Sequence, residues 1–126
     1  LRIAKKYGMH YSSNLCDDDR PYQKDLENGE TLLEIPIHWD NYDLPYFAFN
    51  YHPAFPKGQG RIANYTGVIN NWKDEYGLCY VLQLDPAAIG APGRIGLLEE
   101  LLDYIDEFDS VWWTSGEEMY QYYQNK

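Results

Sequence analysis

Asp85 is the residue whose place in the sequence points most directly to chemistry. It follows an apolar, aromatic-rich segment at residues 78–84 and precedes a Gly- and Pro-containing turn that leads into a helical pattern. A rigid strand that delivers a polar side chain to its carboxyl end, where a crevice opens, is how α/β enzymes build active sites. Two interpretations fit Asp85: a functional group that faces a pocket, or a residue that caps the helix beginning at Pro86.

The histidines and cysteines form no metal-binding pattern. His10, His38 and His52 lack the short i, i+4 spacing that would bring two imidazoles to one metal ion. Cys16 and Cys79 lie far apart and are part of no CxxC motif. We therefore expect reduced, buried thiols rather than a disulfide framework or a zinc knuckle, and no metal site from these residues alone.

The composition excludes several classes of partner. Ten Lys and Arg residues against twenty Asp and Glu residues give a formal net charge of −10, whereas nucleic acids and anionic membranes are bound by basic surfaces. No apolar run approaches the roughly 20 residues that cross a bilayer. Aromatic residues make up 17% of the chain, and Tyr and Trp suit both stacking on sugar rings and an ordinary core. A neutral substrate fits best, and a homo-oligomer is compatible with these features.

Helical and strand-like patterns alternate along the chain. Helical patterns cover residues 1–7, 64–76 and 95–108, and a capping box of Thr114 with Glu117 opens a final helix. Strand-like segments cover residues 31–37, 78–84 and 110–113, and loop patterns cover residues 11–22, 38–47 and 50–62. This alternation predicts parallel strands with right-handed crossovers. Because three strands cannot close a barrel, we expect one α/β domain over residues 1–126 that is incomplete.

Several motifs, in this order, resemble those of one enzyme family. Tyr11-Ser12-Ser13 with Asp18-Asp19-Arg20-Pro21-Tyr22 resembles the family segment YDSS…DDRPY. Glu34-Ile35-Pro36-Ile37-His38-Trp39 with Asp43-Leu44-Pro45 resembles E-[IV]-P-V-x-W…DD-x-P. Leu82-x-x-Asp85-Pro86 with Ile89-Gly90-x-Pro92-Gly93-Arg94 resembles L-x-x-H-P…IGRPxR. These segments are similar to polysaccharide deacetylases (the NodB-homology domain of carbohydrate esterase family 4), in particular to the branch with allantoinase-like and peptidoglycan-deacetylase-like members.

The resemblance implies a fold and a cofactor. The fold is a distorted barrel of the (β/α)7 type, and this chain matches its C-terminal part. The divalent, zinc-like metal of such a domain is held by an Asp and two His from early motifs that have no counterpart here. The resemblance thus implies a metal in a longer parent chain and no metal bound by residues 1–126.

It also implies roles for four residues. Asp85 stands where the family has the His that protonates the leaving amine, and an ionised carboxylate is the poorer proton donor at neutral pH. Leu82 matches the Leu of that motif. Trp39 would form an apolar wall around the acyl group, with core packing as the alternative. Asp43 matches the second Asp of the Trp-containing loop, and Trp39, Asp43 and Leu82 are expected to line the substrate pocket. Tyr42 replaces the first Asp there.

The resulting expectation is a hydrolase of non-peptide carbon–nitrogen bonds that removes acetyl groups from an amino-sugar polymer. An allantoinase-like hydrolase of ring amides is the alternative within the family. A non-catalytic carbohydrate-binding domain, or a degenerate structural domain, is the alternative outside catalysis. By itself this stretch of chain is expected to be inactive.

Overall fold

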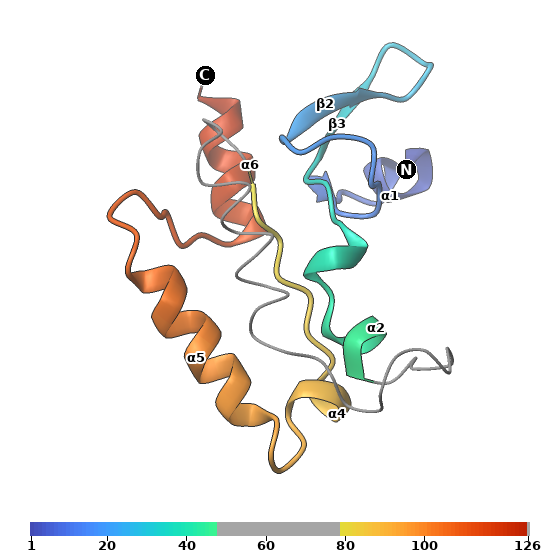
Figure 1. Cartoon of the computed structure of the whole chain (residues 1–126). Coiled ribbons are helices and arrows are strands. Elements are labelled where there is room, and N and C mark those ends of the chain that lie inside the picture. The colour runs from blue at the N-terminus through green and yellow to red at the C-terminus, as the bar shows by residue number, and fades with distance from the viewer. Residues whose placement is uncertain (48–78, 126) are drawn as a thin grey trace. The chain divides into compact units, whose positions relative to one another are not determined.

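The computed structural model describes residues 1–47 and 79–125 (Figure 1). Within these, the chain forms two compact units, one from residues 1–37, 79–81 and 112–125 and the other from residues 38–47 and 82–111. The loop predicted at residues 50–62 and the helix predicted at residues 64–76 lie outside the described residues. Helices and a small mixed sheet make the chain an α/β structure. The incomplete (β/α)7-type barrel and the single domain remain predictions.

The first unit contains a three-stranded sheet with β3 (Thr31–Glu34) at its centre. β1 (Tyr11–Ser12) pairs with β3 in parallel, and β2 (Tyr22–Asp25) pairs with it antiparallel. β3 is central because its apolar Leu32 and Leu33 are both buried. The strand predicted at residues 31–37 is confirmed but ends at Glu34, shortly before Pro36, which cannot donate to a strand ladder.

The loop predicted at residues 11–22 was wrong at both of its ends, which are strands. β1 is only two residues long, too short to show an alternating pattern. In β2, half-buried Tyr22 and Lys24 alternate with exposed Gln23 and Asp25. The apolar side of this edge strand is formed by a Tyr ring and a Lys stem, which a search for aliphatic residues overlooks.

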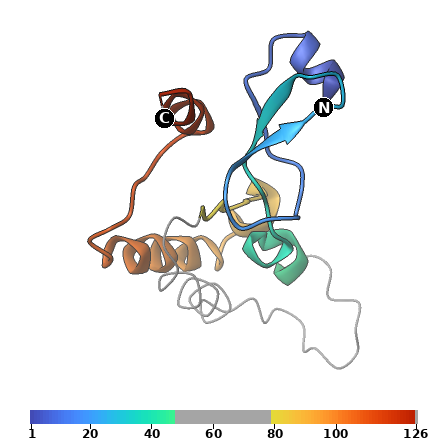
Figure 2. The ribbon, with the colours of Figure 1, turned by 90° about the horizontal axis from the view of Figure 1, so that it is seen from above.

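Two helices complete the first unit. α1 (Arg2–Lys6) lies next to the turn between β2 and β3 (Figure 2) and is followed by Gly8, whose φ of 81° suits glycine. α6 (Gly116–Gln124) packs against β1. A Cβ atom at position 116 would collide with the ring of Tyr11, so Gly116 permits this close approach.

The capping box of α6 lies one residue later than predicted, at Ser115 and Glu118. Ser115 has extended backbone angles, its Oγ accepts from the N–H of Glu118, and its own N–H donates to the Glu118 carboxylate at 2.7 Å. Two adjacent hydroxyl residues, each followed by Glu three positions later, offered the same pattern in the sequence. The strand predicted at residues 110–113 was also wrong: these residues pair with no described strand, and Trp112 and Trp113 are 53% and 55% exposed.

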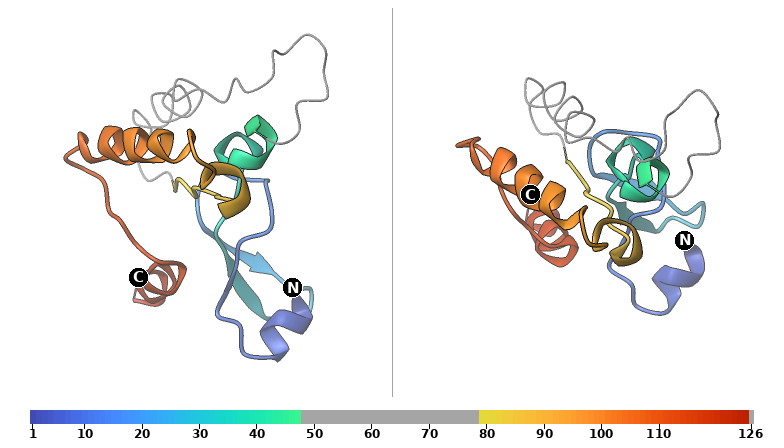
Figure 3. Two further views of the ribbon diagram at one scale, coloured as in Figure 1. Left: turned by 90° about the horizontal axis from the view of Figure 1, so that it is seen from below. Right: turned by 60° about the horizontal axis from the view of Figure 1, so that its bottom comes forward.

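The second unit is helical. The loop predicted at residues 38–47 contains a 3-10 helix, η1 (Trp39–Asn41), and α2 (Asp43–Phe47). The helix predicted at residues 95–108 is confirmed as α5 (Ile95–Asp106), which buries Leu101 and Ile105. α4 (Pro86–Ile89) packs against α2, and the two helices lie side by side in Figures 1 and 3.

The strand predicted at residues 78–84 forms no ladder in the described part of the chain. From residue 79 to residue 85 the backbone makes a single parallel bridge, between Gln83 and Tyr42. No helix among residues 1–47 and 79–125 is long and apolar enough to cross a bilayer.

Candidate active-site turn

The turn that carries Asp85 is held by the carboxylate of Asp43. Asp43 is fully buried at the start of α2. Its Oδ1 accepts from the backbone N–H of Asp85 at 2.8 Å, and its Oδ2 accepts from the backbone N–H of Ile89 at 3.1 Å. Hydrogen bonds to a charged acceptor are stronger than neutral ones. One carboxylate therefore fixes both ends of α4.

The side chain of Asp85 caps α4. Its Oδ1 accepts from the backbone N–H of Ala87 at 2.8 Å, its backbone is extended, and Pro86 follows as the first helical residue. This arrangement satisfies one of the free N–H groups at the helix start. The capping interpretation is thus confirmed, and the role of Asp85 as a proton donor stays a prediction.

A short parallel pairing of two segments brings Asp43 to Asp85. The backbone N–H of Gln83 donates to the carbonyl of Asn41 at 2.9 Å, and the Gln83 carbonyl accepts from the N–H of Asp43 at 3.2 Å. The Gln83 side-chain amide donates to the His38 carbonyl at 3.2 Å. Residues 38–43 and 83–85 are therefore tied along their length, which positions the turn.

Trp39 and Leu82 complete the predicted set. The Trp39 side chain is 70% exposed and tilts against Tyr42, with ring centroids 6.3 Å apart. The alternative of core packing was therefore wrong, and the acyl-pocket wall remains a prediction. Leu82 is half-buried in the extended segment before Asp85.

Arg94 and Asn41 also belong to this region, although sequence reasoning gave them no role. The Arg94 guanidinium donates to the Ala88 carbonyl at 3.0 Å and lies 5.3 Å from the centroid of the Phe47 ring. It thus links the end of α4 to α2, and its place in the Gly/Pro motif could have indicated this. Nothing in the sequence singled out Asn41, whose side chain is completely buried.

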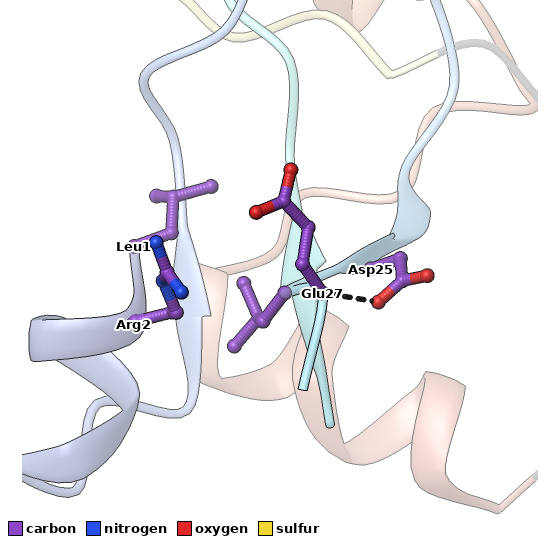
Figure 4. A pocket seen from close by; sticks show the side chains of 5 residues that line it. Leu1, Arg2, Asp25 and Glu27 are labelled. Carbon is purple, nitrogen blue, oxygen red and sulfur yellow. Dashed lines mark hydrogen bonds between the residues drawn. The ribbon is translucent and has the colours of Figure 1, made fainter. Parts of the chain in front are cut away.

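A second buried carboxylate lies in the sheet of the first unit. Glu34 is fully buried, and its Oε1 accepts from the backbone N–H groups of Asn14 at 2.7 Å and Leu15 at 2.8 Å. Glu34 therefore fixes the chain where it leaves β1. A pocket elsewhere in this unit is lined by none of the predicted site residues, as Figure 4 shows; its lining consists of Leu1, Arg2, Asp25, Leu26 and Glu27.

The described residues do not fit the metal that the resemblance implies. No group of three or more His, Cys, Asp or Glu side chains in residues 1–47 and 79–125 is placed to hold an ion. His10 instead bonds the Glu117 carboxylate at 3.0 Å. Of the two cysteines, Cys16 is exposed, contrary to expectation, and Cys79 is half-buried, which raises the pKa of its thiol.

Of the comparisons with known proteins, the one with solved structures gave matches. No family model and no curated protein matches the sequence. Among solved structures, a Mycobacterium smegmatis protein described as a polysaccharide deacetylase matches with a TM-score of 0.76 and 27% identity over 93% of this chain. Puue allantoinase matches with a TM-score of 0.79 and 19% identity, and a Pseudomonas aeruginosa PAO1 protein described as a polysaccharide deacetylase with 0.76 and 20%, each over 98% of this chain.

This chain spans only part of each of those proteins. The matches cover 42%, 41% and 42% of their respective lengths. The two structures with lower identity support the fold alone, and the Mycobacterium smegmatis protein adds similarity in sequence. Together, the matched structures support a polysaccharide deacetylase-like domain in this chain.

Proposed function

We propose that the complete protein hydrolyses non-peptide carbon–nitrogen bonds and removes acetyl groups from an amino-sugar polymer. The similarity to the Mycobacterium smegmatis protein supports this reaction class. The net charge of −10 fits an uncharged substrate such as an N-acetylated sugar. The strongest support for the proposal is the hydrogen bond from the backbone N–H of Asp85 to the buried Asp43 carboxylate, which we call the clamp. The clamp holds the turn that carries Asp85, the residue at the family's proton-donor position.

In this proposal the residues have separate tasks. Amide hydrolysis adds the hydroxyl of water to the acyl carbon and a proton to the nitrogen as the carbon–nitrogen bond breaks. The Asp85 carboxyl would deliver that proton, Asp43 would hold the Asp85 turn, and the exposed ring of Trp39 would line the acyl group. Leu82 would form part of the same pocket.

The divalent, zinc-like metal of the family is part of the proposal for the complete protein only. Such an ion polarises a carbonyl group and activates water. The residues described in the structure do not fit it, so its ligands would have to come from other residues.

Two observations favour other functions. The fold that this chain shares with an allantoinase, over 98% of its length, makes hydrolysis of a ring amide the second candidate. The use of the Asp85 carboxylate as a helix cap favours a non-catalytic domain that binds carbohydrate or has only a structural role.

One experiment separates these functions. The full-length protein is incubated with zinc and either N-acetylglucosamine tetramer or allantoin, and released acetate and opened ring are measured. Acetate release that is lost in Asp85→Asn supports the proposal. Ring opening without acetate release supports the allantoinase-like function. Binding of the tetramer without turnover, or no interaction with either compound, contradicts an amide hydrolase.

A further inference from the structure

Asn41 is buried with its side-chain hydrogen bonds unmade. The side chain is 0% exposed, and neither Oδ1 nor Nδ2 has a hydrogen-bond partner in the part of the chain that the structure describes. Its backbone, by contrast, is fully used: the N–H donates to the His38 carbonyl at 3.0 Å, and the carbonyl accepts from Gln83. The backbone of Asn41 is therefore fixed by hydrogen bonds, while its side-chain amide has no partner.

Such an arrangement is unfavourable for folding. Most buried polar side chains in proteins are bonded to other protein groups or to water, and an unpaired amide loses its hydration without compensation. Asn41 could be replaced by an apolar residue of the same branching, so packing does not call for an amide. A buried side-chain amide that lowers the stability of the fold is typical of a residue with a role in ligand binding.

The place of Asn41 indicates what it would bind. It is the last residue of η1, two positions before Asp43, and its carbonyl bonds Gln83, which is two positions before Asp85. The short parallel pairing that ends at the candidate site therefore also carries Asn41. A carboxamide offers one donor and one acceptor side by side, which complements another amide group.

We propose that Asn41 binds the amide group of the substrate, with Nδ2 donating to its carbonyl oxygen and Oδ1 accepting from an N–H. The proposal rests on the proposed amide hydrolysis and assigns that function a specificity-determining residue. A ring amide presents its C=O and N–H on one edge and can satisfy both atoms of Asn41. An acetamido group presents them on opposite sides and satisfies one. Because Asn41 is completely buried in this structure, the groups that cover it must move aside when ligand binds.

The test compares Asn41→Leu with Gln83→Leu in the full-length protein. Leu has the branching of Asn without its polar atoms, and Gln83 is the matched control because its amide is already bonded to His38. Without ligand, we expect Asn41→Leu to melt at or above the wild-type temperature and Gln83→Leu to melt below it. Allantoin or N-acetylglucosamine tetramer should raise the melting temperature of the wild type and of Gln83→Leu, but not that of Asn41→Leu. A larger rise with allantoin indicates a ring amide, and a larger rise with the tetramer an acetamido group.

Several outcomes would overturn the inference. If Asn41→Leu melts as low as Gln83→Leu, the amide has a structural partner. If Asn41→Leu hydrolyses amides with the wild-type KM, the function stands and only the role of Asn41 fails. If the wild type neither hydrolyses nor is stabilised by either compound, the proposed function itself fails and the role of Asn41 fails with it.

Discussion

The backbone N–H of Asp85 donates to Oδ1 of the buried Asp43 side chain at 2.8 Å. Position 43 thereby determines the backbone at position 85, although 41 residues separate them in sequence. The second Asp43 oxygen accepts from the Ile89 N–H, so both oxygens of this fully buried carboxylate bond the backbone of the turn. Asp43 is consequently a positioning residue, and the group it presents is Asp85.

Asp43→Asn should destabilise the protein. An Asn side chain keeps one acceptor oxygen and turns an N–H₂ group toward a backbone N–H, so one buried donor loses its partner. We expect the free energy of unfolding in urea to fall by about 1–3 kcal/mol. Asp103→Asn makes the same chemical change on an exposed face of α5 and should stay within about 0.5 kcal/mol of wild type. Equal stability of the two variants would contradict the clamp.

Substitutions at Asp85 separate capping from catalysis. Asp85→Ala removes the acceptor for the Ala87 N–H and should lower stability by about 0.5–2 kcal/mol, whereas Asn caps nearly as well as Asp. Asp85→Asn should therefore fold like the wild type and yet lose amide hydrolysis, because it has no carboxyl proton to donate. Thermal melting and turnover measured on both variants give the comparison. Full turnover in Asp85→Asn would leave capping as the role of this residue.

The capping box of α6 makes stability depend on pH. Hydrogen bonds from the Ser115 backbone and side chain lower the pKa of Glu118 from its ordinary value of 4.5. A carboxyl group with a lower pKa in the folded state stabilises the fold above its unfolded-state pKa, and this contribution disappears as the pH falls through the folded-state pKa. The urea midpoint should therefore drop below about pH 4.5 in wild type and drop less in Glu118→Gln. An identical pH dependence in the two proteins would show that the box adds no stability.

Glu34 should tolerate an amide but not an apolar side chain. Glu34→Gln keeps one oxygen for the N–H groups of Asn14 and Leu15, while Glu34→Leu leaves both buried donors without an acceptor. We expect Glu34→Leu to cost about 1–3 kcal/mol for each donor that stays buried and Glu34→Gln to cost less. Urea unfolding measures both variants, and Glu34→Leu folding as stably as Glu34→Gln would speak against the bonds to Asn14 and Leu15.

The parts of the fold that the sequence predicted are those with strong local patterns. The apolar face of α5 repeats over three turns, and Leu32 and Leu33 mark β3. β1 and β2 were missed because they form only through pairing with β3. The segment before Asp85 resembled a buried strand, but a strand needs a ladder of paired residues, and in the described chain this segment makes one isolated bridge, between Gln83 and Tyr42.

The sequence predicted which residues belong to the candidate site but not which groups they contact. Asp43 was chosen on a family motif, and Asp85 on its place after a strand-like segment as well as on a motif, but neither pattern gives the direction of a side chain. The sequence could not show that the Asp43 carboxylate faces backbone N–H groups, nor that Asn41 is buried. Both facts follow from the pairing of Gln83 with residues 41–43, which joins segments distant in the sequence.

Hydrogen exchange at the amides of Asp85 and Ile89, measured by NMR in the wild type and in Asp43→Ala, tests the clamp most directly. We expect both amides to be protected in the wild type and to exchange at least about tenfold faster in the variant, since a hydrogen bond to a charged group is worth about 1.5–3 kcal/mol. The amide of Leu101 in α5 should be unchanged. Unprotected Asp85 and Ile89 amides in the wild type, or equal exchange in both proteins, would contradict the account.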